Sequence, residues 1–359
     1  MEQALDSIFW APVDAVRRSL LRALGPLARW LIIDREARVT AFGLGIVAFC
    51  LAATTFFPLW LMALGPVLVG APHLVGDIRY LVVRPGLHRT TGFWVAVAVP
   101  LAVAYFLPKG AIGMFAVAGA LLISRASWNR RLIGLGVWAA GYLVLLKLGR
   151  VGTLSVLSGH NVLTLAIWWS WRDRKWGKEG WVLLAFVVAS ALILTGAINP
   201  LVLWAGGLQA PESGLTIRQL ARNVLPMRFP HLAARLVLWY GFAQAVHYST
   251  WVRLVPEDDR VRATPRTFLS SWRALHADFG TLGLAAAVLV SLGIAVWAVV
   301  DLKQARLGYL RAASFHFYLE IAVLSLCWAE RHRPGKPRWE ERPLPQPVEA
   351  APLPLAVAR

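Results

Sequence analysis

Two histidines in stretches of otherwise apolar sequence are each followed, four residues later, by a carboxylic acid. The pairs are His73 with Asp77 and His316 with Glu320. Residues four apart share one face of a helix, and neutral imidazole is the commonest metal ligand in proteins, suited to iron, copper or zinc. Each acid is therefore placed to accept the second ring N–H of a ligating histidine, or to bind a metal itself. We predict that Asp77 and Glu320 are catalytic acids.

The elements that must position these residues are membrane-spanning helices. Of the 359 residues, 58% are hydrophobic and 16% charged, a balance that a soluble globular protein of this length does not normally reach. Apolar runs recur that are long enough to cross about 30 Å of hydrocarbon as helices. We predict an all-α, polytopic integral membrane helix bundle with about ten transmembrane helices, eight or nine remaining possible. The predicted spans are 39 to 59, 61 to 83, 91 to 107, 110 to 124, 132 to 148, 153 to 171, 180 to 198, 232 to 254, 280 to 300 and 307 to 329.

The distribution of positive charge predicts the orientation of this bundle. The formal net charge is +18, and most of the 37 lysines and arginines fall in the termini and in alternate loops. This positive-inside pattern places both termini in the cytoplasm, in an inner membrane of the bacterial type. The same charge accounts for attraction to anionic membrane lipids, so we expect no nucleic-acid partner.

Three segments are expected along the chain. Residues 1–38 are predicted to form a cytoplasmic amphipathic helix in the membrane interface. Residues 39–329 form the transmembrane bundle, and residues 330–359 are Pro-rich and predicted to be a disordered cytoplasmic tail. The polar loop from residue 256 to residue 273 is expected to be a plain connector.

Four histidines fall at similar depth in the second, sixth, eighth and tenth spans, which run in the same direction. They are His73, His160, His247 and His316, each 9 to 15 residues before the inner boundary of its span. At 1.5 Å per residue these depths are about 14 to 22 Å. Ionisable groups are costly in hydrocarbon and usually mark a site. We therefore expect the four rings to meet near the midplane, where at least three of them share a metal or a haem.

The residues around His73 allow further expectations. Pro72 removes a helix hydrogen bond and predicts a bend in the second span. Asp77 has an alternative partner, because Arg79 or an arginine from another helix can form an ion pair with it.

The string GAPHLVGD, residues 70–77, has the form G-x-P-H-x-x-x-D. It resembles the GxPHGxxD signature of the Brp/Blh family, membrane-embedded enzymes that cleave β-carotene to retinal with a histidine-ligated non-haem iron. The resemblance implies a multi-helix bundle, iron held by histidines from several spans, dioxygen as oxidant and a long polyene as substrate. It assigns His73 as an iron ligand and Asp77 as its companion acid. The chain departs from the family pattern at Leu74, where the family has glycine, and at Ile78, where a second histidine commonly follows.

Three functions are compatible with these residues. The first is an integral-membrane, Fe(II)-dependent oxygenase that acts with dioxygen on a lipid-soluble isoprenoid such as a carotenoid. The second is an electron-transfer or quinone-linked protein with haem b held by two of the histidines. The third is a proton-coupled transporter in which the acids and histidines form a relay.

Overall fold

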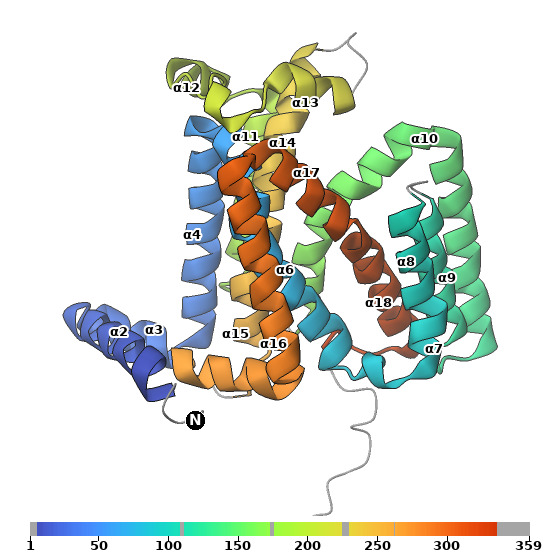
Figure 1. Ribbon diagram of the computed structural model, residues 1–359, viewed down its shortest axis with the longest axis horizontal. Helices are drawn as coiled ribbons and strands as arrows, with labels where there is room; N and C mark the ends of the chain where they lie inside the picture. Colours follow the sequence, from blue (N-terminus) through green and yellow to red (C-terminus); the bar gives the residue numbers. More distant parts are fainter. Residues whose placement is uncertain (1–5, 108–110, 173–175, 225–229, 262, 336–359) are drawn as a thin grey trace, which may run out of the picture.

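The computed structural model describes residues 6–107, 111–172, 176–224, 230–261 and 263–335, which fold into a bundle of helices (Figure 1). No strand occurs in these ranges. The predicted all-α class is therefore confirmed. Most of the tail predicted to be disordered, residues 336–359, lies outside the described residues.

Most of the described chain is α-helical, and short π- and 3-10 turns join or extend the α-helices. The α-helices are α2 (Ala11–Ala23), α3 (Pro26–Ile33), α4 (Arg35–Phe56), α5 (Pro58–Leu68), α6 (Gly70–Asp77), α7 (Thr91–Phe93), α8 (Val99–Phe106), α9 (Phe115–Leu122), α10 (Trp128–Ser170), α11 (Gly180–Thr195), α12 (Asn199–Trp204), α13 (Ile217–Val224), α14 (Pro230–Ser249), α15 (Val255–Asp258), α16 (Phe268–Val300), α17 (Leu302–Ala312) and α18 (His316–Glu330). The short turns are η1 (Asp6–Trp10), η2 (Ile78–Val83), η3 (Leu87–Arg89), η4 (Trp94–Ala98), η5 (Ile112–Met114), η6 (Pro211–Ser213), η7 (Thr250–Leu254) and η8 (Ala313–Phe315).

Within the described ranges, five helical segments are long and apolar enough to cross a membrane, or six if one bent pair counts as a single span. They indicate a membrane protein. The expected number of ten spans is not confirmed, because the apolar helices Thr91–Phe106, Ile112–Leu122 and Gly180–Thr195 are shorter than a full span. The five are Arg35–Phe56, Trp128–Gly149, Val151–Ser170, Phe268–Val300 and Leu302–Glu330, and the bent pair is Pro58–Leu68 with Gly70–Val83.

Two glycines bend the longest helices. Gly149 has a φ of 54° inside α10, and Gly280 has a φ of 67° inside α16. A positive φ is readily adopted only by glycine, so the chain turns at these points without a side-chain clash. The turn in α10 falls between the predicted spans 132 to 148 and 153 to 171.

The bend that directs α6 into the bundle follows from two prolines. α5 and the α6–η2 segment meet at an angle of 51°. The bend lies near Leu68, four residues before Pro72, because in a regular helix the proline ring would clash with the carbonyl of that residue. Pro66, inside α5, cannot donate a hydrogen bond to the Met62 carbonyl. The buried Arg306 side chain from α17 donates to that carbonyl instead, at 2.7 Å. A side chain from a distant helix thus satisfies the backbone group that proline leaves open.

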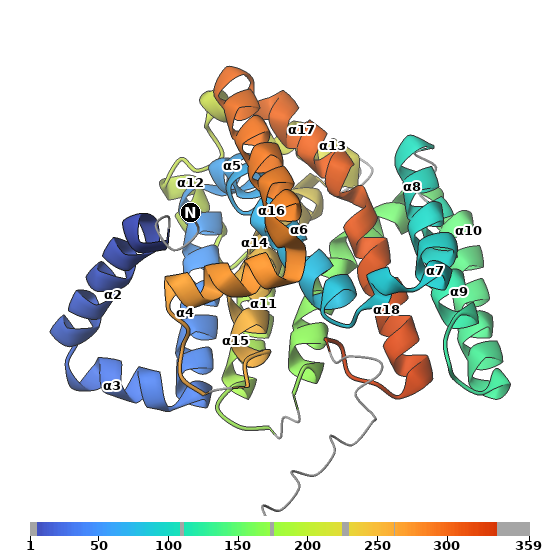
Figure 2. The same ribbon diagram turned by 60° about the horizontal axis from the view of Figure 1, so that its bottom comes forward.

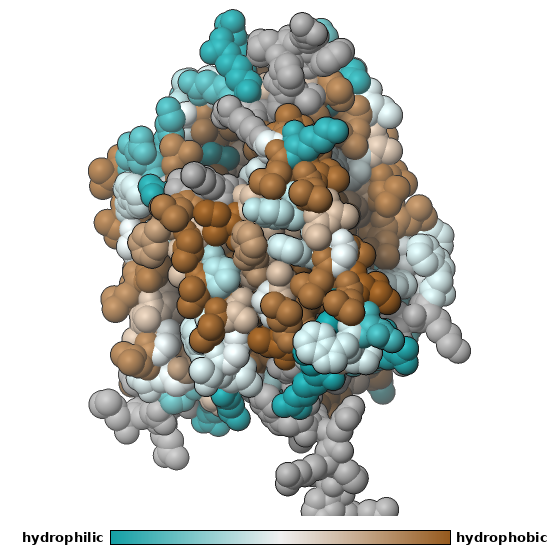
Figure 3. All heavy atoms as spheres, turned by 90° about the vertical axis from the view of Figure 1, so that its right-hand side faces the viewer, coloured by the Kyte–Doolittle hydropathy of each residue, from teal (hydrophilic) through white to brown (hydrophobic). Residues whose placement is uncertain are grey.

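The surface carries a broad apolar zone between more hydrophilic ends (Figure 3). Part of this zone belongs to α10, which exposes large apolar side chains along its first half. They are Leu132, Ile133, Val137, Leu143, Val144, Leu146 and Leu148. Such a zone is expected where helices face hydrocarbon.

The N-terminal helices lie beside α4 and the first part of α16 (Figure 2). Asp14 of α2 is buried and accepts hydrogen bonds from the backbone N–H groups of Phe268 and Leu269, at 2.8 and 3.2 Å. These groups open α16, where the helix dipole favours a carboxylate. The opposite side of α2 exposes Val16 and Leu20, as an interfacial helix would.

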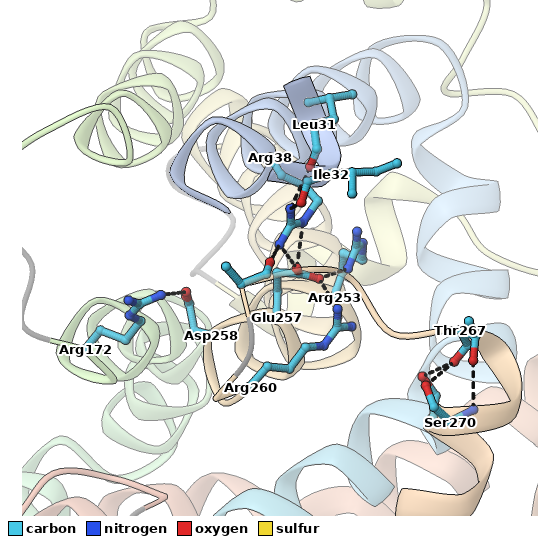
Figure 4. A network of polar contacts seen from close by, with 12 residues as sticks. Leu31, Ile32, Arg38, Arg172, Arg253, Glu257, Asp258, Arg260, Thr267 and Ser270 are labelled. Atoms are coloured by element: carbon cyan, nitrogen blue, oxygen red, sulfur yellow. Dashed lines mark hydrogen bonds and ion pairs between the residues drawn. The ribbon is translucent and has the colours of Figure 1, made fainter. Parts of the chain in front are cut away.

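The loop that was expected to be a plain connector contains a buried cluster of charges (Figure 4). Glu257 is 1% exposed and pairs with Arg38 at 2.6 Å, Arg253 at 2.7 Å and Arg260 at 3.0 Å. Arg38 also donates to the Leu31 carbonyl, which lies near the end of α3. The expectation was wrong because the contact between Arg38 and Glu257 joins residues 219 positions apart, which local composition cannot reveal.

Replacement of Glu257 by glutamine is expected to destabilise the protein by about 3 to 5 kcal/mol, because buried arginines then lack a counter-charge. Burial disfavours the ionised carboxyl, but Arg260 and Arg253 outweigh this and hold the pKa of Glu257 below its usual value. Its contribution to stability is therefore full above the usual glutamate pKa and is lost as the pH falls through the lowered folded value. Denaturant unfolding in detergent micelles at pH 7 and pH 3 measures both effects. The exposed Glu212→Gln variant is the control, and equal stability of the two variants would contradict the prediction.

Candidate metal centre

Four helices surround one buried region of the bundle, and each contributes a histidine. α6 and α10 each pack against both α14 and α18. Their ribbons lie around the centre of the molecule in Figure 1. His73 lies in α6, His160 in the second half of α10, His247 near the end of α14 and His316 at the start of α18.

The side chains of His73, His247 and His316 converge. One ligand nitrogen from each lies within 4.8 Å of the other two. The ring centroids are 5.0 Å apart for His73 and His316, 5.2 Å for His73 and His247, and 5.6 Å for His247 and His316. None of the three residues is more than 6% exposed. The predicted meeting of histidines from separate helices is confirmed for these three.

His160 contacts this group from α10. Its ring centroid lies 4.9 Å from that of His247 and 5.0 Å from that of His316. The residue is 5% exposed. It does not belong to the set of three whose ligand nitrogens are mutually within 4.8 Å. His160, the fourth predicted ligand, thus lies next to the cluster formed by the other three histidines.

The Nδ1 atoms of His73 and His316 are held by backbone carbonyls in the same local arrangement. His73 Nδ1 contacts the Gly70 carbonyl, and His316 Nδ1 contacts the Ala313 carbonyl, each three residues earlier in the chain. A carbonyl oxygen can only accept, so Nδ1 carries the proton and Nε2 keeps its lone pair. Both Nε2 atoms are buried without a hydrogen-bond partner among the described residues.

His247 is held through a hydroxyl. Its Nδ1 atom lies 2.7 Å from Thr164 Oγ1, and the threonine hydroxyl donates to Glu320 Oε1 at 3.1 Å. Trp251 Nε1–H donates to the same glutamate oxygen at 2.8 Å. Because the hydroxyl proton goes to Glu320, Thr164 accepts the N–H of His247, whose Nε2 is also buried and unpaired in the described part of the chain. All three histidines of the cluster therefore present a bare Nε2.

Replacement of Thr164 by valine is expected to weaken metal binding about 10- to 100-fold, because His247 loses the group that fixes its tautomer and orientation. Competition with a chelator of known affinity measures the change. Thr164→Ser keeps the hydroxyl and is expected to bind metal nearly as the unchanged protein does. If Thr164→Val bound metal as tightly as the unchanged protein, the hydroxyl would not be needed to orient the His247 ring.

Asp77 lies on the Nε2 side of His73, with its Oδ2 atom 3.8 Å from that nitrogen. The residue is fully buried, and neither carboxyl oxygen has a hydrogen-bond partner among the described groups. The possible ion pair with Arg79 does not form, since Arg79 pairs with Asp278 at 2.6 Å. Asp77 is thus available to a metal or to a molecule bound beside one.

Of the two roles expected for the acids, the first is not found: neither Asp77 nor Glu320 accepts the second ring N–H of its own i−4 histidine. Backbone carbonyls take that role for His73 and His316, because both rings fold back onto the preceding turn. Asp77 faces the opposite nitrogen of its histidine. Glu320 supports a histidine of another helix, His247, through Thr164.

Sequence reasoning missed Thr164 and Tyr309 beside the cluster. Thr164 follows His160 by four residues, a spacing that places it on the same helix face and was available as a signal. Tyr248 packs on His73 with ring centroids 4.2 Å apart, and the Tyr309 hydroxyl lies 3.1 Å from His73 Nδ1. Tyr248 stands next to His247 in the sequence, but nothing there distinguished Tyr309 from other tyrosines in the bundle.

The residues present fit a divalent metal. Buried polar atoms are normally paired, and three unpaired imidazole nitrogens that face one another form the donor set that suits iron, copper or zinc. The carbonyls, Thr164 and Glu320 behind the rings are the supporting groups that such ligands require. Comparison of the chain with protein-family models, with curated proteins and with solved structures finds no match.

Proposed function

We propose that this chain is an integral-membrane oxygenase with a histidine-ligated non-haem iron, acting on a lipid-soluble isoprenoid such as a carotenoid. The observation that carries the proposal is the convergence of three bare Nε2 atoms in a buried region surrounded by apolar helices. His73, His247 and His316 would hold the metal, with His160 as a fourth ligand. The resemblance of GAPHLVGD to the Brp/Blh signature supports iron and a polyene substrate.

The protein would contribute orientation, exclusion of water and a carboxyl group. When bound, ferrous iron would supply the redox chemistry that uses dioxygen as oxidant. Asp77 Oδ2 would accept or return a proton beside the ligands, because it lies 3.8 Å from His73 Nε2 and has no competing described partner. Glu320 would accept the Thr164 hydroxyl proton and so keep Thr164 hydrogen-bonded to His247 Nδ1. The buried ring of Tyr248 would form part of an apolar wall.

The geometry favours a non-haem metal over haem b. A porphyrin held by two axial histidines occupies a wide, flat slot around its iron. Here the rings of His160 and His316 lie 4.9 and 5.6 Å from that of His247. Such close rings leave no plane for a macrocycle between any two of them. A proton relay for transport uses the same acids, but it does not require three bare nitrogens aimed at one another.

We also propose that the remaining apolar segments complete a bundle of about ten spans with both termini in the cytoplasm. The helices Thr91–Phe106, Ile112–Leu122 and Gly180–Thr195 coincide with three of the predicted spans. Short spans are accommodated by local thinning of the bilayer. This topology can be tested in intact cells by placing single cysteines in alternate loops and at the termini and treating the cells with a thiol reagent that does not cross the membrane. Labelling of both termini from outside would contradict it.

Elemental analysis and an optical spectrum of the purified protein test the proposed metal. We expect about one iron per chain and no Soret band. Expression in cells that produce β-carotene is expected to remove the orange colour and yield a shorter aldehyde. A Soret band would identify haem, and a protein that contains no metal yet consumes the carotenoid would contradict the proposal.

A further inference from the structure

A cavity that is partly open at the surface lies beside α6. This cavity has a volume of about 860 Å³ and is bounded by α2, α4, α6, η2, η7 and α16. Its volume is in the range of small-molecule sites. Pro72, Gly76 and Arg79, which share a helix face, line it, whereas none of the four histidines does. The histidines therefore lie outside this cavity, although Trp251, which donates to Glu320, is part of its wall.

The cavity wall is strongly positive. Six arginines line it, namely Arg17, Arg38, Arg79, Arg253, Arg260 and Arg266. Two carboxylates pair with them: Glu257 with three of the arginines and Asp278 with Arg79. Six guanidinium groups less two carboxylates leave an excess of four positive charges. Figure 4 shows three of the arginines gathered at Glu257.

Arg79 points to an anion in particular. The residue is 6% exposed, and its Nη2 atom is buried without a hydrogen-bond partner among the described residues. Its other nitrogens donate to Asp278 and to the Tyr80 hydroxyl. A buried guanidinium N–H without an acceptor is costly. Arg17 and Arg266 add two guanidinium groups that form no ion pair with a described carboxylate.

The rest of the wall is apolar. α16 contributes Leu284, Ala287, Val288 and Leu292, which repeat at helical spacing along one face. Phe42 of α4 also lines the cavity, with its ring centroid 4.0 Å from the guanidinium carbon of Arg253. A cavity lined both by arginines and by a row of apolar side chains matches a molecule with a charged head and an apolar tail. Arginine forks bind phosphate oxygens in pairs, and a phosphate monoester carries about −1.5 to −2 charges.

We propose that this cavity binds a phosphate-headed amphiphile from the membrane, with the head on Arg17, Arg79 and Arg266 and the tail along α16. This proposal does not depend on the function proposed for the histidine cluster. Its occupant lies against α6, the helix that carries His73.

Equilibrium binding of radiolabelled hexadecyl phosphate to the detergent-solubilised full chain tests the proposal, with hexadecanol and inorganic phosphate as competitors. We expect saturable binding of one molecule per chain, competition by hexadecanol at least about tenfold weaker, and no displacement by millimolar inorganic phosphate. Equal competition by hexadecanol would overturn the role of the arginines. Displacement by inorganic phosphate at micromolar concentration would indicate a site for a free anion and overturn the amphiphile.

Matched variants separate binding from folding. Arg266→Gln and Arg17→Gln are each expected to weaken binding about tenfold, whereas the exposed Arg222→Gln on α13 is not. Ala287→Trp fills the apolar part and is expected to abolish binding, whereas Ala286→Trp, which does not line the cavity, leaves it unchanged. Thermal unfolding of each variant controls for loss of structure. Unchanged binding in Ala287→Trp and both arginine variants would overturn the site.

Discussion

Replacement of His73 by alanine is expected to reduce metal affinity at least about a hundredfold and to leave the purified protein nearly metal-free. His73 supplies one of three bare Nε2 atoms that lie within 4.8 Å of one another. Loss of a group that only orients a ligand already costs about 10- to 100-fold, and loss of the ligand itself costs more. Turnover of the isoprenoid substrate is expected to fall with the metal content. Elemental analysis and chelator competition measure the change.

His231→Ala is the control for the first prediction. His231 lies at the opposite end of α14 from His247 and is exposed. We expect that variant to keep its metal and its activity. If His73→Ala retained stoichiometric metal, the histidine cluster would not be the metal site, and the proposed oxygenase would lose its physical basis.

Replacement of Asp77 by asparagine is expected to change stability and metal affinity in opposite directions. The carboxyl group is fully buried without a described hydrogen-bond partner, which is costly in the metal-free protein. A neutral amide of the same shape lowers that cost, so the metal-free variant is expected to unfold at a higher temperature. The variant also loses a negative group 3.8 Å from His73 Nε2. We expect metal affinity to fall about 10-fold or more and turnover to fall about 10²- to 10⁴-fold.

Asp278→Asn separates this effect from the loss of a carboxylate in general. Asp278 forms the ion pair with Arg79, so its replacement is expected to lower stability and leave metal affinity unchanged. Thermal unfolding of metal-free protein and titration with ferrous iron give both quantities for each variant. Equal metal affinity in Asp77→Asn and the unchanged protein would remove Asp77 from the site.

The convergence of histidines was predictable because depth in a membrane helix is encoded directly in residue number. His73, His247 and His316 stand at similar distances from the predicted inner ends of helices that were predicted to span the membrane in the same direction, and the structure places the three residues together. The bend before His73 was predictable from Pro72. Both predictions use only helix rise and local chemistry.

The partners of those histidines were not predictable in the same way. Each acid was expected either to accept an N–H from a ligating histidine or to bind a metal, but the ring N–H groups of His73 and His316 contact the Gly70 and Ala313 carbonyls instead. The link from Glu320 to His247 depends on how α10, α14 and α18 approach one another. Such approach distances are set by side-chain shape over the whole bundle.

The number of spans and the charged loop were also beyond local reasoning. Hydropathy predicted a span at residues 91–107, but the helix Thr91–Phe106 is shorter than a full membrane span, unlike α4. Glu257 looked like an ordinary acid in a cytoplasmic loop until the fold brought Arg38 to it. Charge pairing across more than 200 residues leaves no periodic trace in the sequence.

The Gly70 carbonyl bears on how a metal ion would bind to and leave the histidine cluster. It fixes the His73 ring from within the same helical turn, and the Ala313 carbonyl does the same for His316. The donor atoms are thus aimed before any ion arrives, so capture requires no refolding of the surrounding helices. A chelator should strip the ion from an intact bundle, and the emptied protein should reload on simple addition of the salt.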